Sequence, residues 1–211
     1  MNFGELRAMV ADWCHRSNMT SVIPSCITLA TAQFNRVLRT PEMESRDSRS
    51  ITTEFASLPP DFLEIISVVR DDGKEIRYVA RPNLASHIAA GEEPEPPIYS
   101  IEDYQFRFLP APSVSEPLDV SILYFEQIAA LEDDSDENWL LTAYPDAYLY
   151  GALMHARAWL QDDARVALIK PMYEQAIAQI SQRKVAAPGV ASVMQTDIPL
   201  GISRYDITRG Y

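Results

Sequence analysis

Hydrophobic residues recur at helical spacing near both ends of the chain, and the strongest pattern lies between Asn138 and Asp163. Pro145 suits the first turn of a helix because its missing N–H would be unpaired there in any case. Apolar residues follow at spacings of three and four, and others widen the face: Tyr148, Leu149, Tyr150, Ala152, Leu153, Met154, Ala156, Trp159 and Leu160. This breadth predicts a helix at the centre of a bundle, or one pressed against a neighbouring subunit. The residues expected at that core or subunit interface are Tyr144, Tyr148, Leu149, Leu153 and Trp159.

The first forty residues predict a helical hairpin. Asn2 and Glu5 have the spacing of a capping box, and a stripe follows at Phe3, Leu6, Val10 and Trp13. Pro24 can open a second helix, which Pro41 stops. Its predicted buried stripe is Ile27, Ala30, Phe34 and Leu38.

From Glu42 the period changes to that of strands. The segment Phe62–Arg70 is rich in Ile and Val, and the turn at 71–74 predicts a hairpin whose partner strand is Glu75–Ala80. A short helix capped by Asn83 is expected over Asn83–Ala90. Further strands are expected at Ile98–Ile101, Tyr104–Leu109 and Leu118–Gln127, with these side chains inward by alternation: Tyr104, Phe106, Phe108, Val120, Ile122 and Tyr124. Strands this short predict one small antiparallel sheet or sandwich.

After the central helix, Asp162 and Asp163 can cap another helix, whose stripe is Val166, Ile169, Tyr173, Ile177 and Ile180. Pro171 inside it predicts a kink or a break. No helical pattern remains from Val185 onward, yet large apolar residues continue at Ile198, Leu200, Ile202, Tyr205, Ile207 and Tyr211. Such a tail is not typical of a solvated linker. The prediction is an extended arm that inserts side chains into another surface or adds a strand to another chain's sheet, the alternative being a frayed terminus.

Together these patterns predict an α+β protein, mainly an α-helical bundle with an inserted small antiparallel β domain and an extended C-terminal arm. The expected divisions are a hairpin at 1–41, a β-rich insert at 42–131, bundle helices at 132–185 and the arm at 186–211. No run of about eighteen apolar residues and no signal-peptide pattern occurs, so we expect a protein made in the cytoplasm, with no membrane partner.

Charge narrows the functional classes. With 18 basic and 30 acidic residues the net charge is −12, which argues against a surface that grips nucleic acid through its phosphates. It does not exclude a protein that surrounds DNA without holding it. The acidic run Glu132–Glu137 is expected to be a solvated loop with Asp136 near a helix cap, because a cation loop would need spaced oxygens and a tight Gly turn.

Residue types that carry chemistry are sparse. Cys14 and Cys26 are expected to be reduced, small core residues. His15, His87 and His155 have no second ligand at a metal-binding spacing and no nucleophile beside them, and His155 is expected to be a satisfied core or interface residue. No phosphate loop, dinucleotide fingerprint or zinc-protease motif is present. We therefore expect no catalytic residues, no metal and no cofactor.

The order of the segments resembles that of the head-to-tail adaptor (connector) proteins of tailed bacteriophages, specifically the podovirus type. The resemblance covers nearly the full length and is carried by Phe3–Arg7, Phe34–Arg39, Leu58–Phe62 and Tyr144–Leu153, followed by a second helix and the apolar arm. It implies a structural virion protein at the neck, between head and tail. Twelve copies would form a ring docked beneath the portal, extend the DNA channel for ejection, and present a platform for the tail or nozzle protein.

On this reading, DNA passes through the channel without specific binding, since an acidic lumen avoids a track of salt bridges. The arm would reach the portal or an adjacent adaptor subunit, ordering on docking. Two alternatives remain, a tail-tube or tail-completion protein and a cytoplasmic enzyme or regulator of unknown substrate.

Overall fold

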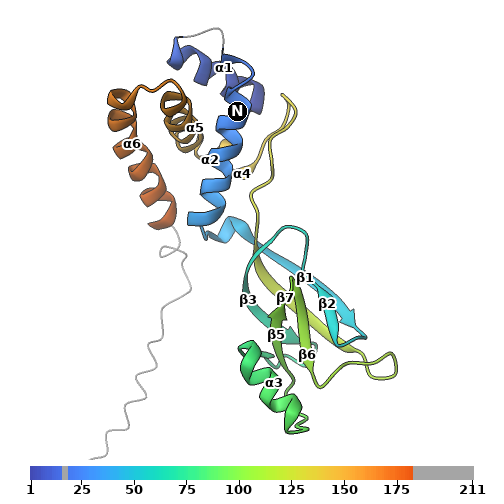
Figure 1. The fold of residues 1–211 in the computed structure, drawn as a ribbon. Coiled ribbons are helices and arrows are strands. Elements are labelled where there is room, and N and C mark those ends of the chain that lie inside the picture. The colour runs from blue at the N-terminus through green and yellow to red at the C-terminus, as the bar shows by residue number, and fades with distance from the viewer. Residues whose placement is uncertain (16–18, 183–211) are drawn as a thin grey trace, which may run out of the picture.

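The computed structural model describes residues 1–15 and 19–182, which form an α+β fold. The helices are α1 (Phe3–Cys14), α2 (Ile23–Val37), the short 3-10 helix η2 (Pro41–Met43), α3 (Arg81–Ala89), α4 (Trp139–Ala143), α5 (Pro145–Trp159) and α6 (Asp163–Gln182). The strands are β1 (Glu44–Ile51), β2 (Phe55–Ser57), β3 (Phe62–Arg70), β4 (Arg77–Tyr78), β5 (Ile98–Glu102), β6 (Gln105–Leu109) and β7 (Leu118–Glu126). In Figure 1, α1, α2, α4, α5 and α6 lie together, while the strands and α3 project below them.

Helix α5 is the element on which the other helices of this group pack, since α1, α2, α4 and α6 all contact it. Gly151 explains the close approach, because a Cβ there would lie 3.1 Å from Phe34 Cζ on α2 and 3.4 Å from Tyr173 Cε2 on α6. The Phe34 and Tyr148 rings meet edge to face, with centroids 5.0 Å apart. The pattern around Pro145 therefore identified the centre of this group of helices.

The predicted helix starts in the N-terminal hairpin are confirmed. Asn2 Oδ1 accepts the Glu5 N–H at 2.9 Å, and the Glu5 carboxylate accepts the Asn2 N–H at 3.1 Å, which completes the capping box. Pro24 lies in the first turn of α2, whose buried face includes Ile27, Ala30 and Phe34. In the described part of the chain, no helix combines the length and hydrophobicity needed to cross a bilayer.

The strands form two sheets, with orders β1-β7-β3 and β2-β6-β5-β4. Side chains from both sheets share one buried cluster: Ile51, Val68, Ile76, Tyr99, Phe106, Phe108, Leu118, Val120, Ile122 and Tyr124. The inward positions predicted at Phe106, Phe108, Val120, Ile122 and Tyr124 are confirmed. Pairing is antiparallel except between β4 and β5, which run parallel.

The predicted hairpin partner of β3 is confirmed only next to the turn. The chain turns at 71–74 as expected, with Gly73 at φ 83; Glu75 then forms an antiparallel bridge with Val69, and the Ile76 N–H bonds to the Val68 carbonyl at 2.8 Å. The next two residues, Arg77 and Tyr78, pair instead with β5 in the other sheet. The physical reason is Ile76, which is 2% exposed in the shared core and takes the chain from one sheet to the other.

Three local predictions also differ from the structure. Tyr104 is 88% exposed because Asp103 and Tyr104 both have positive φ and form the two-residue turn of the β5–β6 hairpin. Helix α3 begins at Arg81 after Ala80, not at Asn83, since Pro82 already suits its first turn. Helix α6 runs unbroken through Pro171, which lies on its exposed side, where water can satisfy the carbonyl left without an N–H.

Candidate interaction surfaces

The central-helix residues singled out from the sequence divide between interior and surface. Tyr148 and Leu153 are fully buried and Leu149 nearly so, whereas Tyr144 is partly buried. Trp159 is 56% exposed at the end of α5. The first three thus contribute to the chain's own core, while Trp159 is accessible to a partner.

The arm residues Ile198, Leu200, Ile202, Tyr205, Ile207 and Tyr211 lie outside the described residues, as does the whole range 186–211. Their role therefore stays a prediction. The described residues end at Gln182, the last residue of α6, so a surface of this chain that receives the arm can be identified only within residues 1–15 and 19–182.

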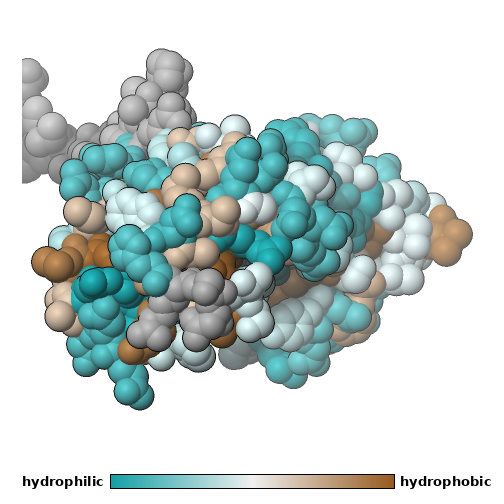
Figure 2. All heavy atoms as spheres, turned by 90° about the horizontal axis from the view of Figure 1, so that it is seen from above, coloured by the Kyte–Doolittle hydropathy of each residue, from teal (hydrophilic) through white to brown (hydrophobic). Residues whose placement is uncertain are grey.

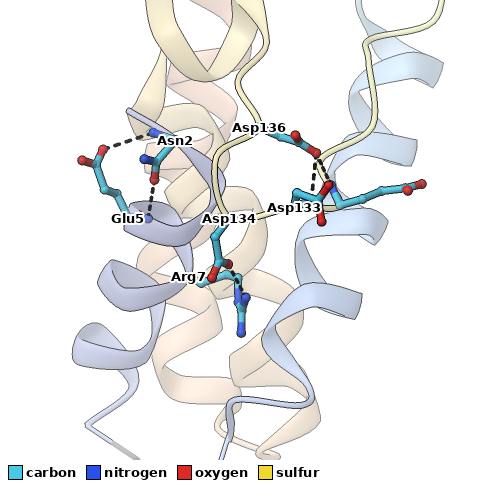
Figure 3. Close-up of polar contacts among 7 residues, drawn as sticks. Asn2, Glu5, Arg7, Asp133, Asp134 and Asp136 are labelled. Carbon is cyan, nitrogen blue, oxygen red and sulfur yellow. Dashed lines mark hydrogen bonds and ion pairs between the residues drawn. The ribbon is translucent and has the colours of Figure 1, made fainter.

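The acidic run is a docked loop rather than a merely solvated one (Figure 3). The first turn of α1 donates to its backbone, with Phe3 N–H bonded to the Asp136 carbonyl at 2.9 Å and Gly4 N–H to the Asp134 carbonyl at 3.0 Å. Arg7 makes an ion pair with the Asp134 carboxylate. Gly4 allows the approach, since a Cβ there would lie 3.2 Å from the Asp134 carbonyl oxygen. The loop therefore satisfies N–H groups that a helix start leaves unpaired.

Within this loop, Asp136 caps backbone groups of the loop and not of a helix. Its carboxylate accepts the N–H groups of Glu132 and Asp133, both at 2.8 Å. These bonds favour the charged form and hold the pKa of Asp136 below its ordinary value. The cap of α4 is instead Asn138, whose Oδ1 accepts the Leu141 N–H at 2.8 Å.

A pH titration should detect this loop. Because the folded pKa of Asp136 is lowered, its stabilising bonds are present above the ordinary aspartate range and are lost as the pH falls through the lowered value. The amide proton shifts of Glu132 and Asp133, followed by NMR, should titrate together with a midpoint below that of a free aspartate. Asp136→Asn should abolish the shared titration, and a midpoint at or above the free value would contradict the capped loop.

A second surface is an apolar groove where the end of α1 meets the outer side of α6. Its lining residues enclose about 270 Å³ and are Trp13, Arg157, Arg165, Leu168, Ile169 and Met172; we call this the α1/α6 groove. Trp13, Leu168 and Met172 are 47%, 70% and 49% exposed. Figure 2, which views the molecule from the helical end, shows hydrophobic side chains in brown at the edge where α6 lies, among mostly hydrophilic neighbours.

Arg157 fixes the walls of this groove. The side chain is only 6% exposed; one guanidinium nitrogen donates to the Trp13 carbonyl at the end of α1, and another to the Asp162 carboxylate at 3.3 Å, just before α6. Asp162 also pairs with Arg165 across the first turn of α6. One buried cation therefore ties together α1, α5 and α6.

The described residues do not assemble an evident catalytic centre. Cys14 and Cys26 are buried free thiols, and burial raises the pKa of both, which makes them poor nucleophiles. His87 contacts Glu92, and no group of three ligands suited to a metal occurs in residues 1–15 and 19–182. His155 was expected to have its hydrogen bonds satisfied, but its buried Nε2 has no hydrogen-bond partner among the described residues. Burial, and then the nearby charge of Arg36, lower the pKa of His155, which favours the neutral imidazole.

Two features of the described residues bring distant segments together, the docked acidic loop and the α1/α6 groove. Sequence reasoning identified neither, because both depend on pairs of segments that lie far apart along the chain. A family model described as "SU10 adaptor protein" matches residues 1–193, which include the helices, the whole β insert and both surfaces. The match ends before the six apolar positions predicted for the arm. No curated protein matches the chain.

Proposed function

The chain belongs to the SU10 adaptor protein family, a family of phage structural adaptors, and on that premise we propose that it forms the ring joining head to tail. In this proposal twelve copies dock beneath the portal protein at the neck of the virion. The ring extends the DNA channel, through which the genome is ejected, and carries the tail or nozzle protein. The podovirus type of neck, suggested by the order of segments, is part of the same proposal.

The observation that carries the proposal is the extent of the family match. It spans residues 1–193 and so includes both the helices and the β insert, not one shared motif. An adaptor has to contact at least two other proteins, and the fold offers separate regions for them. The helices carry the α1/α6 groove and Trp159, while the insert carries its own exposed apolar side chains.

The insert is the part we assign to the next tail component. Its loops expose Tyr104, in the β5–β6 turn, and Val114, between β6 and β7, at 88% and 84%. Exposed aromatic side chains are enriched where proteins meet. The insert also projects away from the helices in Figure 1, so both regions can be engaged at once.

The charge of the chain supports passage of DNA without binding. A net charge of −12 on each copy gives a ring a strongly negative field, which repels phosphates. Tight binding would require clustered Lys and Arg side chains that release counterions. A channel wall with this charge would therefore let the duplex slide.

The test is to mix the purified chain with DNA-filled heads that bear the portal, and separately with isolated tail components. We expect sedimentation of the chain with the heads, and a ring visible beneath the portal by electron microscopy. Binding to tail components alone, without any to portal-bearing heads, would contradict the proposal and favour a tail-tube or tail-completion protein.

A further inference from the structure

The α1/α6 groove is an apolar surface that the described chain leaves uncovered. Three large side chains, Trp13, Leu168 and Met172, are each about half exposed or more around it. Ile169 forms its floor and is 9% exposed. Contiguous exposed apolar surface on an otherwise polar protein marks a site of interaction.

The groove is held in shape before any partner arrives. Arg157 fixes the end of α1 to the start of α6, as described above. The Trp13 ring rests edge to face against Tyr150 of α5, with centroids 6.4 Å apart. A preformed pocket lined by Trp and Arg has the composition of an interaction hot spot, and it binds without the entropic cost of ordering its walls.

We propose that this groove receives the arm of a neighbouring copy, the segment Ile198–Tyr211. The arm supplies matching chemistry, because Ile198, Leu200 and Ile202 are apolar at every second position, with small residues or Pro between them. In an extended segment these three side chains point to one side, from which they can enter an apolar groove.

The length of chain beyond the described residues permits this docking. Helix α6 ends at Gln182, ten residues or about 15 Å of helix beyond the groove residue Met172. The fifteen residues 183–197 can span up to roughly 50 Å when extended. The linker is therefore long enough for the arm to leave its own α6 and extend toward an adjacent subunit.

The choice of a neighbouring copy rests on the proposed function. A segment of one subunit that enters a groove of the next is a heterologous contact, and such contacts repeat around an axis until a ring closes. An arm that binds the groove of its own subunit would cover that groove within one chain and would give no contact between subunits.

A disulfide experiment tests the contact directly. Two full-length variants, Leu168→Cys and Leu200→Cys, are mixed, bound to portal-bearing heads, and mildly oxidised; a second sample is oxidised as concentrated free protein. We expect covalent dimers from the mixture, while a mixture of Leu29→Cys with Leu200→Cys gives none, because Leu29 is exposed on α2 outside the groove lining. The native thiols are buried and should not interfere.

The outcomes separate this inference from the proposed function. If the wild-type chain binds heads but neither sample gives dimers, the neck role stands and the groove contact is overturned. A cross-link that forms only within one chain, in the double variant Leu168→Cys and Leu200→Cys, also overturns it. Dimers in free protein that does not bind heads would support the contact and refute the proposed neck role.

Introducing negative charge into the groove gives an independent readout. The double variant Leu168→Glu and Met172→Glu should reduce the protein retained on heads roughly thirtyfold, the loss expected for one hot spot. Leu29→Glu, at a site on α2 that is 50% exposed and outside the groove lining, is the matched control and should leave the retention on heads unchanged. Circular dichroism and melting temperature should match the wild type in both variants, and full retention by the folded double variant would contradict the proposal.

Discussion

Deletion of the residues after Pro188 is expected to abolish attachment to portal-bearing heads while the protein stays folded. The core formed by the described helices is already closed, with Ile180, Tyr173 and Phe34 buried. The deleted segment includes the six apolar residues predicted for the arm, which follow no helical pattern, so its contribution is expected in contacts with other chains. Co-sedimentation with heads measures attachment, and thermal unfolding followed by circular dichroism measures folding.

The matched control keeps the length of the arm and removes only its apolar side chains. Replacing Ile198, Leu200 and Ile202 by Ser should reproduce the loss of attachment, because the buried area on docking falls while the reach of the chain is unchanged. Unimpaired attachment of the truncated protein would show that the arm has no part in joining. A truncated protein that no longer folds would show that the arm belongs to the chain's own core.

Tyr148→Ala is expected to be the most destabilising single substitution on α5. The side chain is fully buried, and its ring packs against Phe34 of α2. Its hydroxyl accepts a hydrogen bond from Asn138 Nδ2 at 2.8 Å and lies 3.3 Å from Thr31 Oγ1. Removing a buried aromatic ring leaves a cavity, and such changes cost about 3–5 kcal/mol. Urea unfolding of the monomer at low protein concentration gives the free energy.

Two control variants distinguish the contribution of the Tyr148 ring from that of its hydroxyl and from the effect of any substitution on α5. Tyr148→Phe keeps the packing, and Asn138 retains its bond to the Ala129 carbonyl at 2.9 Å, so the expected cost is about 1 kcal/mol. Trp159→Ala, at a 56% exposed position of the same helix, should change stability by about 0.5 kcal/mol or less. Equal losses for the Ala and Phe variants would contradict a core organised by the Tyr148 ring.

The helices were predictable because their signals are local. The Asn2 and Glu5 capping pair, the proline at the start of α2 and the spacing after Pro145 each depend on residues within one or two turns. The same holds for the turn at 71–74, where Gly73 takes a positive φ. Local chemistry of this kind can be identified without knowing the fold.

The strand partners were not predictable because alternation identifies an inward face without identifying the neighbour. Ile76 does bond to β3 through the Val68 carbonyl, yet its side chain is buried in the core shared by the two sheets, and the following strand β4 pairs with β5. Tyr104 continues the alternation of Phe106 and Phe108, but two consecutive positive φ values make it a turn residue. Both errors arise where tertiary packing or turn geometry overrides a periodic pattern.

The candidate surfaces were beyond sequence reasoning for a related reason. The docked loop joins Gly4 and Arg7 to Asp134, and the groove joins Trp13 to Leu168. One available signal was the exposed side of α6, since Leu168 and Met172 lie outside its predicted stripe of Val166, Ile169, Tyr173, Ile177 and Ile180. Apolar residues on the wrong side of an amphipathic helix indicate a second contact.

The central claim is that the apolar surface which stays exposed on the folded chain is covered by other copies of the chain and by the portal. An electron-microscopy reconstruction of portal-bearing heads with the bound chain tests it most directly. The account predicts a closed ring beneath the portal, with density from a neighbouring subunit over Trp13 and Leu168. Separate copies whose last residues pack against their own helices, with no ring at the portal, would contradict it.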